Sequence, residues 1–358
     1  MNASSRIPVA VLGATGMVGQ RFIELLSGHP WFELVALAAS DSHGGRPYAE
    51  VSRWRLPGSE MPISAAKLPV LPCRPEALAD VKIVFSALPG EVAGEIEASF
   101  ARAGMAVFSN AKNYRMAPDV PLIVPEVNAD HVASIVEQRK HRGWSGSIVT
   151  NANCSATPLV MALKPLQQAF GVRKVLVTTL QAISGAGYPG LPSYDILDNA
   201  IPFIGGEEEK VEHETRKMLG TWEEGQGFTD APMIVSAQCN RVATREGHLE
   251  CVSVELGTNA SEEDIIAAWE HYKAEPQQLQ LPTAPDHALI YRTEPDRPQT
   301  LRDRDAGRGM SVTIGRLRPC PILSHKFVLL GHNTIRGAAG GSILNAELCV
   351  NKGLLMMD

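Results

Sequence analysis

The chain has 358 residues and a mass of 38.6 kDa, and its 44% hydrophobic content suffices to bury a large core, so we expect two domains. A formal net charge of −6 and an isoelectric point near 6.0 argue against nucleic acid as the main partner. No apolar run is long enough to span a bilayer, and the six cysteines include no C-x-x-C pair. We therefore expect a cytoplasmic protein with reduced thiols, no membrane contact and no metal site.

The first pattern along the chain is that of a nucleotide-binding turn. An apolar strand runs into Gly13-Ala-Thr-Gly16-Met-Val-Gly19, and residues 20–26 continue with helical spacing. Glycines in such a turn let the backbone approach a pyrophosphate, which then sits at a helix N-terminus. The alternative is a glycine turn used only for packing. The predicted cofactor contacts are Gly13, Thr15, Gly16, Met17 and Val18.

A second strand, residues 33–39, ends where the adenosine ribose of a dinucleotide would lie. The sequence there reads Ser40-Asp41-Ser42, with Arg46 four residues on. An acidic residue at this place bonds a ribose 2′-OH, whereas serines and an arginine suit a 2′-phosphate. We expect Ser40 and Ser42 to contact the cofactor, and residue type leaves both NADP and NAD open.

Strands and helices alternate up to about residue 150. Strand patterns cover residues 81–86 and 105–108, and helical patterns cover residues 91–103 and 128–140. This alternation predicts a doubly wound, parallel α/β sheet of Rossmann type.

A cysteine then stands between a strand and a helix. The strand of residues 147–150 leads into Asn151-Ala-Asn-Cys154-Ser-Ala-Thr157, and a helical pattern follows over residues 155–170. Amide groups and the dipole at a helix start stabilise a thiolate and an oxyanion on a bound acyl group, so Cys154 is a candidate nucleophile. We expect Ser155 and Thr157 as caps. The alternative is that Cys154 is one more small buried hydrophobe.

The second half of the chain has a different pattern of hydrophobic residues. Residues 174–183, 249–255 and 310–317 read as longer alternating strands of antiparallel character, which predicts an α+β catalytic and dimerisation domain. Residues 275–309 read as a long loop, followed by a strand at 326–330 and a helix at 333–350. We expect a dinucleotide-binding domain over residues 1–153, to which a helix at about 332–358 returns, and a second domain over 154–331.

Two further clusters contain residues that suit a catalytic site. Arg241 and His248 lie seven residues apart, a spacing that does not by itself put them on one face of a strand. Histidine transfers protons near neutral pH, and an arginine fork grips a carboxylate. The alternative for His248 is a hydrogen-bonded residue at a strand end. The Glu/Lys-rich stretch 205–216 reads by itself as a solvated helix face.

Together these segments resemble aspartate-semialdehyde dehydrogenase, in its archaeal and fungal branch, over nearly the whole chain. The segments that carry the resemblance are 13–19, 109–115, 151–157, 181–187, 205–210, 241–248 and 331–336. The resemblance implies a reversible, NADPH-dependent reductive dephosphorylation of L-4-aspartyl phosphate to L-aspartate 4-semialdehyde. This reaction feeds lysine, methionine and threonine synthesis.

The resemblance also implies roles for single residues. Cys154 carries the acyl group as a thioester and His248 is the general acid/base. The amino-acid end of the substrate is oriented by Arg241, Glu207 and Gln181. Inorganic phosphate is bound by Lys210, Asn110 and Arg115, and the nicotinamide half of NADP by Ser184, Gly185, Gly187 and Asn333.

Alternatives remain at this point. Asp41 interrupts the serine-rich turn, which keeps NAD open beside NADP. Malonyl-CoA reductase is built on the same archaeal-type fold, and Arg241 would hold a malonyl carboxylate equally well. A nucleotide-binding regulator without chemistry would have no use for Cys154 and His248 together. The resemblance and the long strands predict a homodimer or homotetramer.

Overall fold

The computed structural model describes residues 6–40 and 44–355, and the chain divides into two compact units. Unit 1 contains the described residues of 1–123, 130–151 and 342–358, and unit 2 contains residues 124–129 and 152–341. Among the described residues, no helix is long and apolar enough to cross a membrane.

Unit 1 is built on a seven-stranded sheet in which every pairing is parallel. The strand order is β3-β2-β1-β4-β5-β7-β6. The strands are β1 (Ile7–Leu12), β2 (Phe32–Ala39), β3 (Val70–Pro72), β4 (Ile83–Ser86), β5 (Ala106–Ser109), β6 (Leu122–Ile123) and β7 (Ser147–Asn151). Every residue of β4, β5 and β7 is buried, as is typical of central parallel strands covered on both faces.

The helices of unit 1 connect these strands. They are α1 (Met17–Leu26), α2 (Tyr48–Val51), α3 (Ile63–Ala66), α4 (Gly90–Arg102), α6 (Ser134–Arg142) and α13 (Gly340–Asn351), with a 3-10 turn at Pro75–Leu78. The single helix predicted over residues 128–140 is wrong. That stretch divides into the end of α5 (Pro125–Asn128), a 3-10 turn (Ala129–Ala133) and α6, and its first residues belong to unit 2.

The C-terminal helix α13 packs within unit 1. Glu347 on this helix lies 2.8 Å from Nε2 of His29, and both side chains are buried. His29 also stacks on Phe32 at the start of β2, and Asn345 donates to the carbonyl of Ile123. These contacts attach the end of the chain to strands formed at its beginning and middle.

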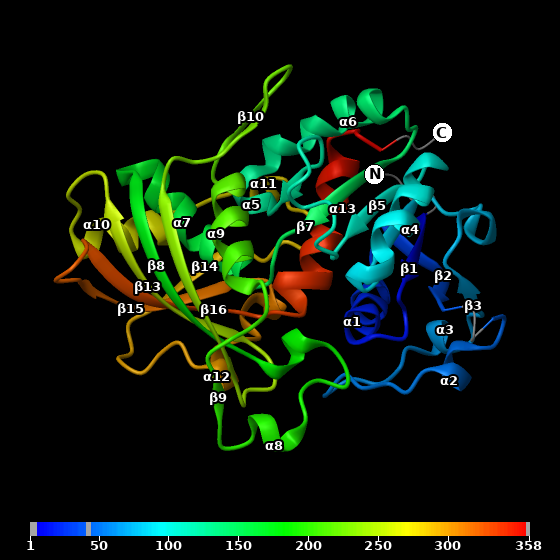
Figure 1. The fold of residues 1–358 in the computed structure, drawn as a ribbon, viewed down its shortest axis with the longest axis horizontal. Coiled ribbons are helices and arrows are strands. Elements are labelled where there is room, and N and C mark those ends of the chain that lie inside the picture. Colours follow the sequence, from blue (N-terminus) through cyan, green and yellow to red (C-terminus); the bar gives the residue numbers. More distant parts are fainter. Residues whose placement is uncertain (1–5, 41–43, 356–358) are drawn as a thin grey trace. The chain divides into compact units, whose positions relative to one another are not determined.

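Unit 2 contains a second seven-stranded sheet, in the order β14-β15-β16-β13-β8-β12-β9 (Figure 1). Its strands are β8 (Val172–Gln181), β9 (Ala200–Ile201), β12 (Ile234–Val242), β13 (His248–Leu256), β14 (Leu289–Arg292), β15 (Val312–Pro319) and β16 (His325–Gly331). The expectation of antiparallel strands holds only in part, because β12 runs parallel to β8 and β14 runs parallel to β15. The predicted fold class, a Rossmann-like doubly wound unit with a second α+β unit, is confirmed.

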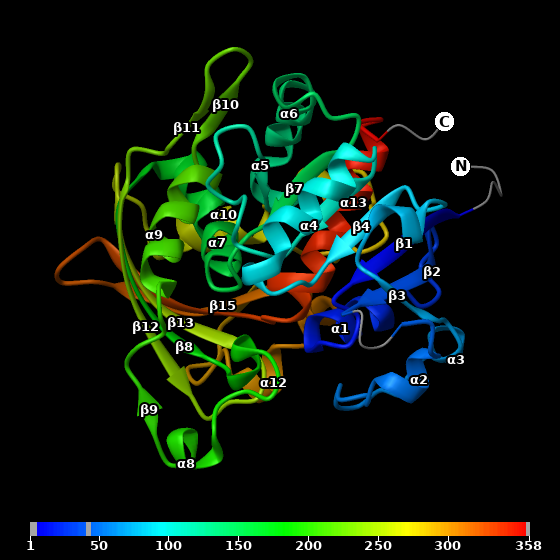
Figure 2. The same cartoon turned by 45° about the vertical axis from the view of Figure 1, so that its right-hand side comes forward.

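Unit 2 also contains several helices. They are α5, α7 (Ala156–Phe170), α8 (Ser193–Ile196), α9 (Glu207–Met218), α10 (Glu262–Glu270), α11 (Glu275–Gln278) and α12 (Thr300–Asp303), with 3-10 turns at Ile183–Ala186 and Ala306–Gly309 and a π-helical turn at Ile335–Ala339. Helix α7 is the central one, since it contacts β13, β15 and β16 and is buried over most of its length. A hairpin of β10 (Thr221–Glu223) and β11 (Gly227–Thr229) projects from this unit (Figure 2).

The prediction of a structureless loop over residues 275–309 is wrong. The segment contains α11, α12 and β14, which extends the sheet as an edge strand beside β15. Arg297 binds the buried carboxylate of Asp303 through two nitrogens, and Asp303 also accepts from the backbone of Gln299. This two-point contact between guanidinium and carboxylate fixes the conformation of a polar segment that has few apolar side chains to bury.

Candidate active site

Cys154 and His248 meet within unit 2. Cys154 lies in the turn directly before α7, and its Sγ is 3.2 Å from Nε2 of His248. His248 is the first residue of β13, as its position at a strand start predicts, and its side chain is fully buried. The start of a helix is where a thiolate and an oxyanion are stabilised, so this geometry suits a nucleophile and its proton-transfer partner.

The start of α7 is capped by Asn153, which sequence reasoning missed. Oδ1 of Asn153 accepts from the amides of Ser155 and Ala156, at 2.8 and 3.0 Å. The predicted caps are wrong, because the Ser155 side chain makes no capping bond and Thr157 donates to the Asn153 carbonyl. An asparagine between a strand and a helix is a favoured N-cap, and this was the signal in the sequence.

Asn153 also connects the cysteine turn to α9. Its Nδ2 donates to Oε1 of Glu207 at 2.8 Å, and its backbone amide donates to Oε2 of Glu214 at 2.6 Å. Lys210 pairs with Glu207 at 2.9 Å. Burial opposes ionisation of Glu207, yet the hydrogen bond from Asn153 and the charge of Lys210 hold the pKa of Glu207 below its ordinary value. Glu207 is therefore an anion at neutral pH.

The prediction that residues 205–216 form a solvated helix face is wrong, because several glutamates of α9 accept hydrogen bonds from buried parts of unit 2. Glu208 accepts from the amide of Cys239, and Glu212 accepts from the amide of Ala237, each at 3.0 Å. Both amides belong to β12, which pairs with its outer neighbour β9 only at Arg241 and Val242. The glutamates thus satisfy backbone donors that the short edge strand leaves without a ladder partner.

Arg241 reaches the same region from β12. Its Nη1 donates to the carbonyl of Ala182 at 2.7 Å. Gln181 ends β8 beside Arg241 in the register of the sheet, and its amide donates to Thr179. A Cβ added to Gly185 would lie 2.7 Å from Nη1 of Arg241 and 3.2 Å from Cε1 of His248. The missing side chain of Gly185 therefore lets both groups approach this backbone.

The environment of His248 disfavours a positive charge on its ring. Burial is the largest cause, followed by the nearby charge of Arg241, and together they lower the pKa of His248 to about 3. The anion of Glu207 acts in the opposite direction but does not compensate. This environment therefore favours the neutral form of the His248 ring.

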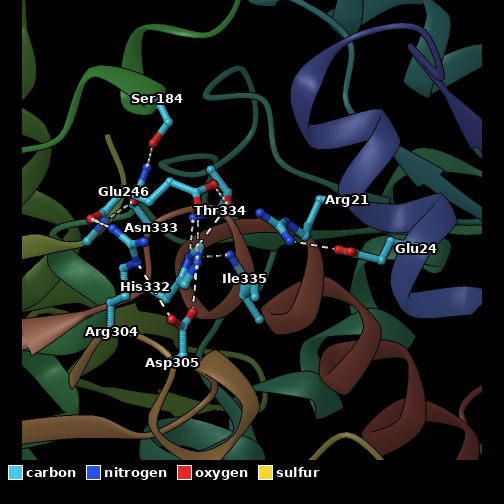
Figure 3. Close-up of polar contacts among 11 residues, drawn as sticks. Arg21, Glu24, Ser184, Glu246, Arg304, Asp305, His332, Asn333, Thr334 and Ile335 are labelled. Carbon is cyan, nitrogen blue, oxygen red and sulfur yellow. Dashed lines mark hydrogen bonds and ion pairs between the residues drawn. The ribbon is translucent and has the colours of Figure 1, made fainter. Parts of the chain in front are cut away.

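Asn333 joins two turns of unit 2 (Figure 3). Its Oδ1 accepts from the amide of Gly247, and its Nδ2 donates to Oγ of Ser184, each at 2.8 Å. Next to it, the buried His332 lies 3.6 Å from Glu246 and 3.8 Å from Asp305. The residues expected at the nicotinamide, Ser184 and Asn333, thus contact each other, and Gly187 ends the 3-10 turn with a φ of +70°.

A further glycine lies against the cysteine. Gly337 sits in the π-helical turn, and a Cβ there would be 2.8 Å from both Cα and Cβ of Cys154. The sequence offered only the helical pattern of residues 333–350, which did not indicate that one turn is widened. The π-helical turn brings backbone, not side chain, against the candidate nucleophile.

In unit 1 the glycine turn has the geometry that a dinucleotide site needs. Gly13 has a φ of +72°, and a Cβ on it would lie 2.6 Å from the carbonyl oxygen of Ala87. Gly16 is the N-cap of α1, where no side chain makes a capping bond and the first turn has no acidic residue. Thr15, Met17 and Val18 occupy this turn and the first residues of α1.

The remaining predicted contacts of unit 1 lie at the ends of its strands. Arg115 donates to the carbonyl of Asn110 at 2.8 Å, and Asn110 accepts from Asn151, so these residues are close together. Ser40 follows β2 and is exposed, whereas Ser42, like Asp41, lies outside the described residues. Within residues 6–40 and 44–355, no group of three or more His, Cys, Asp or Glu side chains is arranged to hold a metal ion.

Two family models match the chain. The model described as semialdehyde dehydrogenase, NAD binding domain, matches residues 8–135. The model described as semialdehyde dehydrogenase, dimerisation domain, matches residues 163–336.

Similar proteins are found in archaea and fungi. Aspartate-semialdehyde dehydrogenase of Archaeoglobus fulgidus is 51% identical over 350 residues, which cover 98% of this chain and all of the relative. The Schizosaccharomyces pombe enzyme of that name is 48% identical over 353 residues, covering 97% and 99% of the two chains. The crystal structure of aspartate semialdehyde dehydrogenase with NADP from Candida albicans superposes with a TM-score of 0.90 at 44% identity, covering 98% of this chain and all of that one.

Proposed function

Because the chain belongs to the aspartate-semialdehyde dehydrogenase family, we propose that it reduces L-4-aspartyl phosphate to L-aspartate 4-semialdehyde with NADPH, reversibly and with release of phosphate. The product would feed lysine, methionine and threonine synthesis. The observation that supports this best is the 3.2 Å approach of Cys154 Sγ to His248 Nε2 at the start of a buried helix.

The glycine turn of unit 1 fits an NADP pyrophosphate. A Cβ on Gly13 would collide with the Ala87 carbonyl, and the start of α1 has neither a side-chain cap nor an acidic residue to repel a phosphate. When bound, NADPH supplies the hydride that reduces the acyl group. We assign its contacts to Gly13, Thr15, Gly16, Met17, Val18, Ser40 and Ser42 in the first domain and to Ser184, Gly185, Gly187 and Asn333 in the second.

The thiolate of Cys154 attacks the acyl carbon of the substrate, and His248 acts as the general acid/base that moves the proton of the thiol. The C–O bond to phosphate breaks, and the acyl group remains on sulfur as a thioester. After reduction, the alkoxide of the thiohemiacetal collapses, which releases the aldehyde and restores the thiolate. Covalent capture divides one difficult displacement into two easier steps.

Charged side chains would select the substrate. Arg241 is suited to the α-carboxylate, and the anion of Glu207 to the α-ammonium group, with Gln181 beside them. Lys210, Asn110 and Arg115 are assigned to phosphate. We further propose a homodimer or homotetramer in the cytoplasm, with domains at residues 1–153 and 154–331 and a C-terminal helix that completes the first domain.

The test is a spectrophotometric assay of phosphate-dependent NADP reduction with aspartate semialdehyde, run beside malonyl-CoA with NADPH. We expect turnover only in the first assay. Cys154→Ala should abolish turnover and leave the Kd for NADP within about twofold, because the thiol forms the bond and the glycine turn holds the nucleotide. Turnover of malonyl-CoA alone, or activity above about 1% in the variant, would contradict the proposal.

A further inference from the structure

We propose that Glu246 is a positioning residue for hydride transfer, because its carboxyl group fixes the backbone around Asn333 and thereby orients the nicotinamide of NADP. The inference rests on the proposed function, in which Asn333 is assigned to the nicotinamide. It deepens that function, since it assigns a residue to the second step of the reaction alone. Glu246 acts through Asn333 and is not itself a catalytic residue.

The carboxyl group of Glu246 contacts the residues on both sides of Asn333. Its Oε1 accepts from Oγ1 of Thr334 at 3.2 Å, and its Oε2 lies 3.6 Å from Nε2 of His332 (Figure 3). Nδ1 of His332 accepts from the backbone amides of Thr334 and Ile335, each at 3.3 Å. Glu246 and residues 332–334 are all buried, so a polar group that lost its partner there would not regain one from water. The backbone before and after Asn333 is therefore held in one arrangement.

The residue after Glu246 holds the side chain of Asn333. The N–H of Gly247 donates to Oδ1 of Asn333 at 2.8 Å, and Gly247 has a φ of +96°, which favours glycine. Nδ2 of Asn333 donates to Oγ of Ser184, also at 2.8 Å. An amide nitrogen has two N–H donors, and the bond to Ser184 uses one of them. The other is suited to the carboxamide oxygen of a nicotinamide.

The segment directly before His248 also holds Ser184. The amide N–H of Ser184 donates to the carbonyl of Arg245 at 3.2 Å. Residues 245–247 thus bond to both side chains that are assigned to the nicotinamide, while His248 at the next position lies 3.2 Å from Cys154. One short stretch of chain therefore links the cofactor contacts to the proton-transfer partner of the nucleophile.

The two steps of the reaction depend differently on these contacts. Thioester formation takes place between Cys154 and the substrate and needs no hydride. Hydride transfer requires the reacting carbons at near-attack distance, and a misplacement of about 1 Å costs on the order of 100-fold in rate. Loss of the Glu246 carboxyl group should therefore slow hydride transfer and leave thioester formation near its normal rate.

The first test is nucleotide binding, which does not depend on turnover. Calorimetric titration compares NADP with 2′-phospho-ADP-ribose, which has the same adenosine and pyrophosphate groups but no nicotinamide. We expect Glu246→Ala to raise the Kd for NADP by at least about fivefold, as for the loss of one hydrogen bond, and to leave the Kd for 2′-phospho-ADP-ribose within about twofold. Equal weakening of both nucleotides, or no change in either, would overturn the inference.

The second test measures the two steps separately in single turnovers. Phosphate release from L-4-aspartyl phosphate without NADPH reports thioester formation, and oxidation of NADPH mixed with the acylated enzyme reports hydride transfer. In Glu246→Ala we expect phosphate release within about twofold of wild type and NADPH oxidation at least about tenfold slower. A loss of folded protein would lower the amplitudes of both signals and not the ratio of the rates. Equal slowing of both steps would refute a role in hydride transfer.

Thr334→Val tests the contact itself, should Glu246→Ala fail to fold. Valine keeps the shape of the side chain and removes the hydroxyl that donates to Glu246. We expect NADPH oxidation to slow by at least about threefold, again with normal phosphate release. Normal rates of both steps in this variant would show that the contact does not position Asn333.

Asp305→Ala is the matched control. Asp305 lies 3.8 Å from the same His332 ring but is 71% exposed, and we expect both rates to stay close to wild type. Equal effects of Asp305→Ala and Glu246→Ala would show that charge near His332, and not the contact with Thr334, decides the rate. Failure of wild type to release phosphate from L-4-aspartyl phosphate would reject the proposed function, whereas the comparison of the two nucleotides would still test Glu246.

Discussion

Glu126 and Arg336 form a two-point ion pair inside unit 2. Nη1 donates to Oε1 and Nη2 to Oε2, each at 2.7 Å, and neither side chain is more than 1% exposed. Glu126 lies in the short stretch of residues 124–129 that belongs to unit 2 between two stretches of unit 1. Arg336 lies in the π-helical turn that also contacts Cys154 through Gly337. The ion pair therefore holds residues 124–129 against the π-helical turn that contacts the candidate nucleophile.

Removing one partner of this pair should destabilise the protein strongly. Glu126→Ala leaves a buried guanidinium without its counter-ion, and we expect a loss of about 3–5 kcal/mol in the free energy of unfolding. The measurement is urea unfolding followed by circular dichroism. The control is Glu33→Ala, which breaks the half-exposed pair with Arg6 and should cost less than about 1 kcal/mol. Equal losses in the two variants would show that burial does not set the cost.

Arg241→Lys should impair catalysis although the charge is kept. A lysine ammonium cannot both donate to the Ala182 carbonyl and grip a carboxylate in two places. We expect kcat/KM to fall by about two orders of magnitude, roughly 3 kcal/mol of transition-state stabilisation. Arg173→Lys, at the exposed far end of β8, is the matched control and should remain close to wild type. Near-normal kinetics of Arg241→Lys would show that the carboxylate is held elsewhere.

Gly13→Ala should weaken NADP binding by at least about tenfold. The new Cβ would lie 2.6 Å from the Ala87 carbonyl oxygen at a φ of +72°, so the turn has to move away from the position that suits a pyrophosphate. Gly28→Ala is the control, because Gly28 has a similar φ of +76° with nothing within 4 Å of its Cβ. Calorimetric titration of both variants with NADP measures the effect. If Gly13→Ala and Gly28→Ala have the same Kd for NADP, the close contact with Ala87 does not decide the affinity.

Glu250→Gln should stabilise the protein, and increasingly so as the pH rises. Glu250 is fully buried, neither carboxyl oxygen has a hydrogen-bond partner among the described residues, and burial, with the charge of Glu207, raises its pKa well above 4.5. Above that pH the unfolded chain loses the proton while the folded protein keeps it, so wild type loses stability as pH rises. Glutamine has no such proton to lose.

We expect the stability difference between Glu250→Gln and wild type to be small at pH 4.5. It should then grow by up to about 1.4 kcal/mol per pH unit towards pH 8. Urea unfolding at pH 5 and pH 8 tests this. A difference that is independent of pH would mean that Glu250 is ionised in the folded protein.

Much of the fold was predictable because its determinants are local. The glycine turn before α1 depends on three glycines and the apolar strand before them, and β13 begins at His248 as its alternation predicts. Prediction from local sequence patterns was wrong where contacts with residues distant in the sequence decide which element forms. The helix expected over residues 128–140 breaks into segments that belong to different units, and β14 forms because β15 offers an edge for parallel pairing.

The sequence by itself determined that Cys154 stands between a strand and a helix and that a glycine turn opens the chain, because both patterns depend on residues adjacent in the chain. Only the tertiary structure decided which groups meet Cys154. His248 is 94 residues away, and its approach depends on the order of strands in the second sheet. The same holds for Ala182, whose amide and carbonyl reach His248 and Arg241, since backbone groups leave no signal in residue type. Hydrogen bonds require atoms at about 3 Å, and the sheet, not the sequence spacing, sets those distances.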